Sequence, residues 1–565
     1  MAISVKQLKK MFVDSGLITG ADFIEAQKDA RAAGVSLEAA LTAQGSLTDE
    51  QMGKVIADAY GIQFVNLNRV KIDPKAVAVI PEIVTKKQGI MAYAWSGESL
   101  LVVMTDPENV EFLSFLEKKT GYPVSVAYTT PEILSSALSS FDENTVAKIT
   151  ALIEEYNDLI HASKKTLKTM EGEEDVVIRL VDHIMQYGYG NSASDIHIEP
   201  QEDKSLMRYR IDGVLHDLMT MPKALYEKVL SRIKILSNLR TDEHFAAQDG
   251  KFRFVADGTK VDVRVSILPV VGGEKVVMRL LSDKGRAYTL EHLGFCERDF
   301  AQVQGSALKP YGMILVTGPT GSGKTTTLYS ILRLLNRREV NIQTIEDPVE
   351  YDIEGINQIQ VNEKTSLTFS MGLRSIVRQD PDIIMVGEIR DSETAGIAIN
   401  AAMTGHLVLS TLHTNDSATA LPRLLDMGVE PFLVASSVNL IVAQRLVRKI
   451  CSACITSTKV ETSQLKTSIP KDLFAKYFGD QTAVRLYKGK GCPSCNNTGY
   501  AGRQGIFEVM EVTDAVKELI INRENASRIT KQAQTEGMLL MFEDGIKKAL
   551  AGSTTIEEVL RVAVS

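Results

Sequence analysis

The chain has 565 residues, of which 44% are hydrophobic and 24% are charged, the balance of an ordinary globular protein. This length indicates about three or four domains. The formal net charge of -8 argues weakly against a nucleic-acid motor, and we expect no nucleic-acid partner. The first residues lack the apolar core of a signal peptide, and no window reaches the roughly 18 apolar residues of a membrane span. We therefore expect a cytosolic protein whose contact with any membrane is peripheral.

The N-terminal third is expected to hold two small domains and a linker. Residues 1–62 predict a helical module in two similar units, since helices there end at glycine and begin again at threonine. Residues 63–139 predict a small α/β domain, because the apolar run at 99–104 is typical of a buried strand. Residues 140–174 are polar, helix-prone and end in an acidic run, so we expect a linker there.

The rest of the chain is expected to form two further α/β domains. Residues 175–289 predict a helix followed by four strands, at 195–199, 206–211, 261–267 and 274–281, with hairpin turns at Gly250, Gly258 and Gly272-Gly273. Residues 290–565 alternate strands with helices, which is typical of a doubly wound α/β domain. A polar, loop-rich insertion is expected at about 450–505.

The most specific motif occupies residues 318–325, where Gly-x-x-x-x-Gly-Lys-Thr fits the phosphate-binding loop. An apolar strand at 313–316 precedes it and an apolar-periodic helix at 326–335 follows it, as the motif requires. Lys324 is expected to reach the β- and γ-phosphates and Thr325 to bind Mg²⁺. The predicted nucleotide-binding residues are Gly318, Pro319, Thr320, Gly321, Ser322, Gly323, Lys324, Thr325 and Thr326.

Two further strands are predicted, at 341–345 and 382–386. Glu346 directly follows the first, and Glu388 lies two residues after the second. Ligands of open α/β sheets bind at the carboxyl ends of strands, so both are expected to approach the phosphate loop. An ATPase needs one carboxylate to orient or deprotonate water and one to support Mg²⁺. We predict Glu388 as the catalytic base and Glu346 as its rival, the alternative for each being a helix cap or surface acid. Gly387 stands where a metal-binding aspartate is usual, so metal support is expected to shift to Thr325 and the two glutamates.

Histidines and arginines supply further candidates. A strand at 407–412 leads to His413, which is a candidate sensor of the γ-phosphate; His406 is a second candidate, and a structural role is the alternative for both. Transfer of a γ-phosphate gains from an arginine, often supplied by a neighbouring subunit, although ordinary salt bridges are the alternative. The arginine candidates are Arg374, Arg378, Arg390 and Arg445 in this domain and Arg208, Arg210 and Arg264 in the preceding one.

Four of the five cysteines form two C-x-x-C pairs, Cys451 with Cys454 and Cys492 with Cys495. In a reducing compartment such pairs predict a tetrahedral Cys₄ zinc site, and the absence of an open coordination position indicates a structural role. Free thiols are the alternative. Cys296 is expected to be a small apolar residue.

Together these residues resemble the secretion ATPases that power type II secretion and type IV pilus assembly. The four boxes of that family occur in order at 318–325, 344–350, 387–391 and 405–415. Residues 194–200 and 210–213 resemble the domain before the motor, and the C-x-x-C pairs followed by 498–503 resemble the zinc-containing insertion of the assembly branch. The resemblance implies a multidomain α/β protein in which a PAS-like domain precedes a RecA-like motor domain.

The resemblance also implies cofactors, partners and a location. It implies a homo-hexamer that uses ATP, Mg²⁺ and structural Zn²⁺ at the cytoplasmic face of the inner membrane. ATP hydrolysis would move a membrane platform protein so that pilin subunits enter a growing fibre; type II secretion is the alternative. Nucleotide would lie between the motor and the preceding domain, with Arg208, Arg210 and Arg264 near its phosphates. His244-Phe245-Ala246-Ala247 replaces a basic run of the family, which weakens any charge role there.

Residues 1–62 resemble a module that binds cyclic di-GMP in some relatives. That module begins each repeat with Arg-Leu-Gly, whereas Gln7-Leu8-Lys9 and Ser36-Leu37-Glu38 stand at those positions here. We therefore expect no tight binding of cyclic di-GMP and predict that the module docks other cytoplasmic components of the machine.

Overall fold

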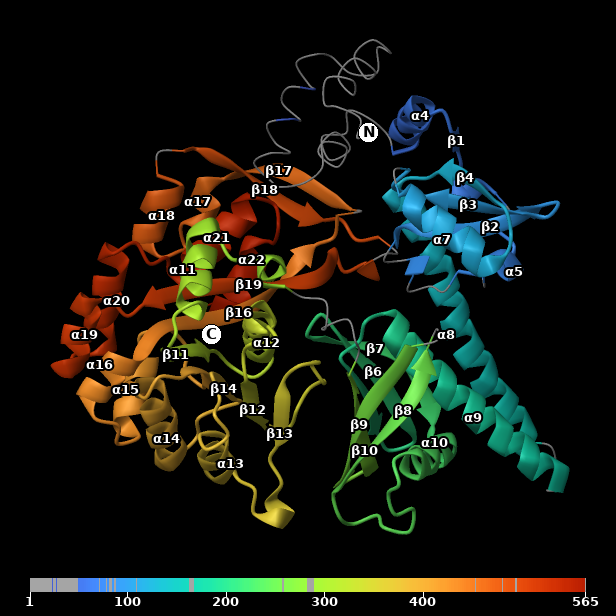
Figure 1. Ribbon diagram of the computed structural model, residues 1–565. Helices are drawn as coiled ribbons and strands as arrows, with labels where there is room; N and C mark the ends of the chain where they lie inside the picture. The colour runs from blue at the N-terminus through green and yellow to red at the C-terminus, as the bar shows by residue number, and fades with distance from the viewer. Residues whose placement is uncertain are drawn as a thin grey trace. The chain divides into compact units, whose positions relative to one another are not determined.

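A computed structural model describes residues 49–563 together with Phe23 and Gln27, apart from gaps at 71, 78, 81–83, 86–87, 108, 162–166, 257–258, 282–288, 453, 480 and 493–494. Most of the helical module expected at 1–62 therefore lies outside the described residues. The chain divides into two compact units (Figure 1). Unit 1 comprises 1–283 with 450–457 and 488–501, and unit 2 comprises 284–449, 458–487 and 502–565. Among the described helices, none is long and apolar enough to cross a membrane.

Unit 1 begins with a small α/β domain around a four-stranded sheet. The strand order is β1-β4-β3-β2, with β3 parallel to β4 and antiparallel to β2. Leu100, Val102 and Val103 of β3 are all fully buried, so both faces of this strand are covered. The elements are α4 (Asp49–Tyr60), β1 (Gln63–Phe64), η1 (Leu67–Arg69), α5 (Pro74–Val77), β2 (Ile90–Ser96), β3 (Ser99–Met104), α7 (Val110–Thr120) and β4 (Val124–Tyr128).

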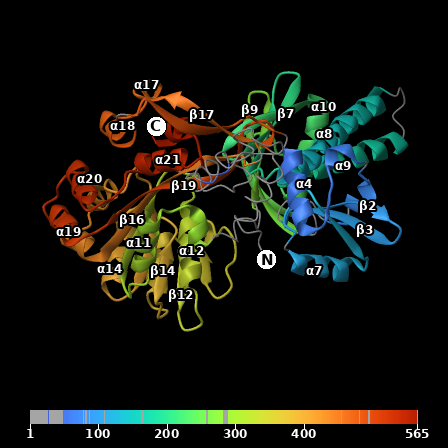
Figure 2. The ribbon, with the colours of Figure 1, turned by 90° about the horizontal axis from the view of Figure 1, so that it is seen from above.

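Two long helices, α8 (Pro131–His161) and α9 (Leu167–Gly190), follow the small domain and lie side by side (Figures 1 and 2). Ile149, Leu152 and Tyr156 of α8 are buried in one core with Val177 and other residues of α9. The range 140–174, expected as a linker, is therefore mostly helical. The apolar residues of this range are scattered in the sequence but lie on one face of each helix. That face becomes part of a core only because α8 and α9 pack against each other.

The second domain of unit 1 is a six-stranded antiparallel sheet with the order β7-β6-β5-β10-β9-β8. Helices α9 and α10 contribute to its core. The four predicted strands are present, whereas β7 and β8 were not predicted; only Met221 of β7 and Ala256 of β8 are buried, and Phe252 and Phe254 of β8 are partly buried. The elements are β5 (Asp195–Pro200), β6 (Lys204–Ile211), β7 (Val214–Pro222), α10 (Lys223–Leu236), β8 (Gln248–Ala256), β9 (Thr259–Val270) and β10 (Gly273–Leu281).

Gly250 does not form the hairpin turn that the sequence predicted. It lies inside β8, where a Cβ atom would come within 2.7 Å of the Ser237 carbonyl oxygen. Glycine is needed here for close approach of two backbones rather than for a turn. Gly272 does lie in the turn between β9 and β10 as predicted, Gly273 is the first residue of β10, and Gly258 lies outside the described residues.

Unit 2 is built around a seven-stranded sheet with the order β13-β12-β14-β15-β11-β16-β19. All neighbours from β13 to β16 are parallel, and the central strands are buried at every residue. Two hydrophobic cores, one with residues of α13 and α14 and one with residues of α11 and α12, account for this burial. The mixed α/β class expected from the sequence is confirmed.

The elements of unit 2 before the insertion are η3 (Leu290–Leu293), α11 (Glu297–Ala307), β11 (Gly312–Thr317), α12 (Lys324–Leu335), β12 (Ile342–Glu346), β13 (Asn357–Gln360), η4 (Glu363–Thr365), α13 (Phe369–Ile376), β14 (Ile383–Val386), α14 (Ser392–Met403), β15 (Leu407–Leu412), α15 (Ala420–Asp426), α16 (Pro431–Ser437) and β16 (Val438–Ile450). After the insertion come β19 (Tyr500–Glu511), α19 (Asp514–Ile521), α20 (Ala526–Thr535), α21 (Met541–Leu550) and α22 (Ile556–Ala563). The predicted strands and helices around the phosphate loop agree with these bounds to within two residues.

The insertion at 450–505 is less loop-rich than expected. It contains β17 (Ile455–Glu461) paired with β18 (Ala483–Gly489), and the short helices α17 (Thr462–Leu465) and α18 (Lys471–Tyr477). Ile469 and Phe478 are buried with Ile546 and Ile556. This core draws on residues distant in the sequence, so the composition of the segment did not reveal it.

The C-terminal helix α22 is held against β16 by a buried ion pair. Arg448 Nη2 lies 2.6 Å from Glu558 Oε1, and the Arg448 backbone N–H donates to Glu558 Oε2 at 3.1 Å. Arg561 Nη2 lies 2.7 Å from the same carboxylate, whose side chain is 3% exposed. Burial opposes ionisation of Glu558, but the hydrogen bonds from Arg561 and Arg448 outweigh it and lower its pKa to about 2.

We predict that Arg448→Ala destabilises unit 2 more than Arg561→Ala. The first change leaves a buried carboxylate short of a partner and costs about 3 kcal/mol, whereas the second removes a half-exposed partner and costs about 1 kcal/mol or less. Because the pKa of Glu558 is depressed, this stability is present above the ordinary carboxyl pKa of about 4.3 and is lost as the pH falls toward the folded value. Thermal unfolding of both variants at neutral and acidic pH measures it, and equal losses at neutral pH would contradict the prediction.

Candidate active site

The phosphate loop joins β11 to α12 and depends on glycine at three positions. Gly318, Gly321 and Gly323 have φ angles of 144°, 79° and 90°, a region that side chains rarely adopt. Space also requires glycine at Gly318, where a Cβ atom would lie 2.5 Å from the Gln444 carbonyl oxygen. A loop of this conformation at the start of a helix can surround phosphate oxygens with backbone N–H groups.

Lys324 is the first residue of α12, and its side chain folds back onto the loop. Its Nζ donates to the carbonyl oxygens of Gly318 and Pro319, at 2.8 and 3.2 Å. Burial lowers the pKa of Lys324, the charge of Arg445 lowers it further, and the charge of Glu388 opposes both. Lys324 therefore shares one electrostatic environment with residues from two other strands.

Gln444 of β16 supports the phosphate loop from the neighbouring strand, and the sequence analysis did not identify it. Its Nε2 donates to the Ser322 carbonyl oxygen at 2.7 Å, and its Oε1 accepts from Thr327 Oγ1 at 2.7 Å. Gln444 is 2% exposed. The signal available in the sequence was a polar residue directly after the apolar run at 440–443.

Glu346 ends β12 and is surrounded by neutral donors. Its Oε2 accepts from Tyr329 OH at 2.5 Å, and its Oε1 accepts from Thr344 Oγ1 at 2.7 Å and Gln358 Nε2 at 3.1 Å. The residue is 3% exposed. Burial raises the pKa of Glu346, and these hydrogen bonds only partly offset the effect.

Glu388 follows β14 and is paired with cationic or polar nitrogens. Its Oε1 lies 2.5 Å from Arg390 Nη2, and its Oε2 lies 3.2 Å from His413 Nε2. Burial opposes ionisation, but the hydrogen bond and charge of Arg390, together with His413, outweigh it and lower the pKa of Glu388. The structure thus brings Glu388, Arg390 and His413 together, because β14 and β15 are adjacent parallel strands.

The packing of β12 against β14 explains why glycine occupies position 387. A Cβ atom on Gly387 would lie 3.3 Å from both the Glu346 Cα atom and the Ile345 carbonyl oxygen. A side chain there would be tighter than most Cβ contacts, so the backbone of β12 would have to give by a few tenths of an ångström. Glycine at 387 allows this close approach without such a shift.

The structure separates the two candidate histidines. His413 follows the carboxyl end of β15, whereas His406 precedes its amino end and has its Nδ1 2.9 Å from the Ala401 carbonyl oxygen. A six-residue strand spans about 20 Å, so within one chain they lie at opposite edges of the sheet.

The remaining arginine candidates make local contacts. Arg374 pairs with Glu393 at 2.5 Å, and Arg378 donates to Ser375 Oγ at 3.3 Å. In unit 1, Arg208 pairs with Asp217 at 2.8 Å, Arg210 donates to the Gly213 carbonyl oxygen at 3.0 Å, and Arg264 lies in β9. The role of the three unit 1 arginines at the phosphate loop stays a prediction.

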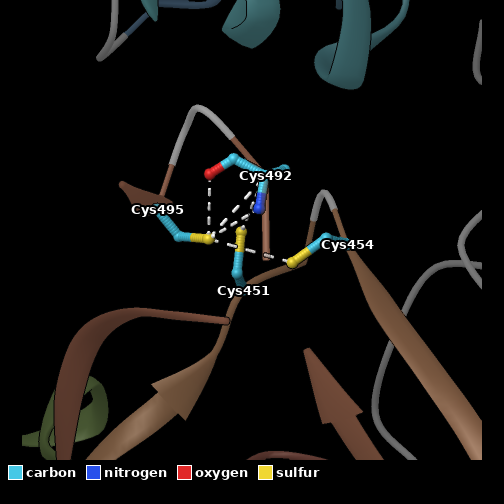
Figure 3. Close-up of side chains that lie close together, drawn as sticks. All are labelled: Cys451, Cys454, Cys492 and Cys495. Carbon is cyan, nitrogen blue, oxygen red and sulfur yellow. Dashed lines mark hydrogen bonds between the residues drawn. The ribbon is translucent and has the colours of Figure 1, made fainter. Parts of the chain in front are cut away.

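The four paired cysteines converge, as Figure 3 shows. Their Sγ atoms lie 3.8 Å apart between Cys451 and Cys492, 3.9 Å between Cys454 and Cys495, and 3.7 Å between Cys492 and Cys495. A tetrahedral zinc ion with Zn–S bonds of about 2.3 Å places its sulfur ligands about 3.8 Å apart, so the residues fit zinc. Burial opposes ionisation of Cys495, but backbone N–H groups of Cys492 and Gly499 outweigh it and lower its pKa, whereas burial raises the pKa of Cys454 to about 12.

Comparison with known proteins defines the class of this chain. The family described as Type II/IV secretion system protein matches residues 170–561, and the MshEN domain matches residues 60–147. The chain belongs to the Type II/IV secretion system protein family and is an ATPase of that family. The MshEN match begins at 60, so it lies almost entirely beyond the range 1–62 in which the sequence resembled a cyclic di-GMP module.

Individual relatives cover nearly the whole chain. It is 38% identical to the Type IV pilus assembly ATPase PilB of Myxococcus xanthus, over 98% of each chain. It is 37% identical to the protein of that name from Pseudomonas aeruginosa, over 99% of each chain. The Type II secretion system protein E of Pseudomonas aeruginosa is 46% identical over 70% of this chain and 78% of that protein. The crystal structure of the Legionella pneumophila ATPase DotB shares the fold, with a TM-score of 0.51 at 20% identity, covering 68% of this chain and 96% of that one.

We predict that Arg390→Ala moves the acid limb of the ATPase pH profile to higher pH. The pKa of Glu388 is depressed, so Glu388 stays ionised as the pH falls through the ordinary carboxyl value of about 4.3. Removing Arg390 takes away the largest lowering contribution, so protonation of Glu388 occurs at higher pH. Turnover measured between about pH 3.5 and pH 8 tests this, with Arg528→Ala, an exposed arginine paired with Glu524, as control. An acid limb unchanged by Arg390→Ala would show that Glu388 does not set it.

We predict about one zinc ion per purified chain. Cys454→Ser should lower the zinc content severalfold, because three thiolates and a hydroxyl bind zinc more weakly than four thiolates. Cys296→Ser is the matched control, since Cys296 lies outside the cluster. Elemental analysis of the three proteins provides the measurement, and a folded wild-type chain that contains no zinc refutes the site.

Proposed function

We propose that the chain is the ATP-hydrolysing motor of type IV pilus assembly and works as a homo-hexamer. The observation that carries this proposal is the share of this chain that each group of relatives matches. Three pilus assembly ATPases match between 94% and 99% of this chain. Type II secretion relatives match between 68% and 86% of it. A role in type II secretion is the second candidate, supported by identities of up to 47% over those shorter matches.

The residues at the edge of the unit 2 sheet support hydrolysis. Backbone N–H groups of the phosphate loop and Lys324 bind the β- and γ-phosphates, and Thr325 with Glu346 supports the site for Mg²⁺, which neutralises phosphate charge when bound. Glu388 orients and deprotonates the attacking water. Arg390 and His413 keep the Glu388 carboxylate oriented and ionised, as their distances of 2.5 and 3.2 Å allow.

Partners and location follow from the same proposal. The motor acts at the cytoplasmic face of the inner membrane on a platform protein, and residues 1–62 dock other cytoplasmic components without binding cyclic di-GMP tightly. The six-stranded domain of unit 1 is the PAS-like domain of the resemblance, and its Arg208, Arg210 and Arg264 contact nucleotide. Zinc at the four cysteines stabilises the insertion.

The proposal is tested in the native bacterium. Deletion of the gene should abolish surface pili and leave type II secretion of exoproteins intact, and the opposite pattern would favour the second candidate. The wild-type gene should restore pili, whereas Lys324→Ala should not. Purified Lys324→Ala and Glu388→Gln should each lose ATP hydrolysis by about 100-fold or more. Lys517→Ala, which changes a surface ion pair with Asp514, is the matched control; unchanged hydrolysis in Lys324→Ala would refute the assignment of the site.

A further inference from the structure

Arg445 of β16 carries a buried charge that its neighbours leave unbalanced. The residue is 9% exposed, and it donates hydrogen bonds to two neutral oxygens, those of Val562 and Asn415. Among the described residues, its Nη1 has no hydrogen-bond partner. A buried guanidinium is costly unless its N–H groups and its charge are satisfied. An anion that accepts a hydrogen bond from Nη1 would satisfy both this donor and the buried charge.

The sheet register places this guanidinium over the start of the phosphate loop. Thr317, the last residue of β11, pairs with Leu412 of β15 on one side and with Ala443 of β16 on the other. Beyond these pairs, Arg445 Nη2 donates to Asn415 Oδ1 at 3.2 Å. That hydrogen bond joins the two strands that flank β11, so it crosses the carboxyl end of β11 where the loop begins.

A second cation lies close by. The charge of Arg445 contributes to the lowered pKa of Lys324, so the two positive groups share one environment. Two cations beside a glycine-rich loop form a site for a polyanion, and a guanidinium can donate to phosphate while its other N–H groups keep their partners.

The third contact of Arg445 reaches the C-terminal helix. Its Nε donates to the Val562 carbonyl oxygen of α22 at 3.2 Å. One side chain thus connects the loop after β15 with α22. The same loop after β15 carries His413, which contacts Glu388.

We propose that Arg445 binds the phosphate chain of the nucleotide in its own subunit through Nη1 and thereby couples nucleotide occupancy to the docking of α22. The inference rests on the proposed nucleotide site and is independent of the role in pilus assembly. With a phosphate oxygen on Nη1, all three donor groups of Arg445 are engaged, and α22 is held more firmly in the nucleotide-bound state than in the free state.

The first measurement is binding. Arg445→Gln removes the charge and should weaken binding of a non-hydrolysable ATP analogue with Mg²⁺ by about 10- to 100-fold in calorimetry on the full chain. Asn415→Asp supplies the missing anion from within the protein, so it should also weaken binding while α22 stays docked. Affinities unchanged within about twofold in both variants would overturn the proposal.

The second measurement is hydrogen exchange in α22. The analogue should slow exchange of the amides at 556–562 in the wild-type chain, and Arg445→Gln should abolish this response. Arg448→Gln is the matched control on the same strand, since Arg448 holds the same helix through Glu558. It should speed exchange in both states and keep the response to the analogue. The proposal would be overturned if the analogue did not slow exchange in α22 of the wild-type chain. It would also be overturned if Arg448→Gln abolished the slowing as completely as Arg445→Gln does, because Arg445 would then be only a structural contact.

Discussion

Burial of the unit 2 sheet on both faces is the constraint on which the site depends. Its central strands expose no residue on either face, so polar chemistry is confined to their ends. The parallel arrangement then brings the residues that follow β11, β12, β14 and β15 to one edge. The phosphate loop, Glu346, Glu388 and His413 meet there for this reason.

The two glutamates at this edge have the same carboxyl group, but their different surroundings shift its pKa in opposite directions. Glu346 is surrounded by a phenol, a hydroxyl and an amide, and burial raises its pKa. Glu388 faces Arg390 and His413, and its pKa is lowered despite burial. A carboxylate that stays ionised suits the orientation of water beside phosphate, whereas a carboxyl fully occupied by neutral donors suits a positioning role.

Strand β16 connects the phosphate loop, the C-terminal helix α22 and the cysteine cluster. Gln444 supports the phosphate loop, Arg445 reaches the loop after β15 and α22, and Arg448 pairs with Glu558 of α22. Cys451, the first of the four clustered cysteines, follows directly after the strand. A change in the position of this strand would therefore act on the nucleotide site and on the C-terminal helix together.

The sequence by itself determined the phosphate loop, the strands around it and the cysteine cluster, because each is encoded by residues close together in the chain or by a specific spacing. It did not reveal β7, β8 or the small core of the insertion, because the apolar residues there are buried only by contact with segments distant in the sequence. It also could not show that Gly250 serves close packing or that His406 and His413 lie at opposite edges. Only the tertiary structure decided which strands flank β11, and hence that Gln444 and Arg445 lie beside the phosphate loop, since strand order in a sheet follows from packing between distant segments and not from local pattern.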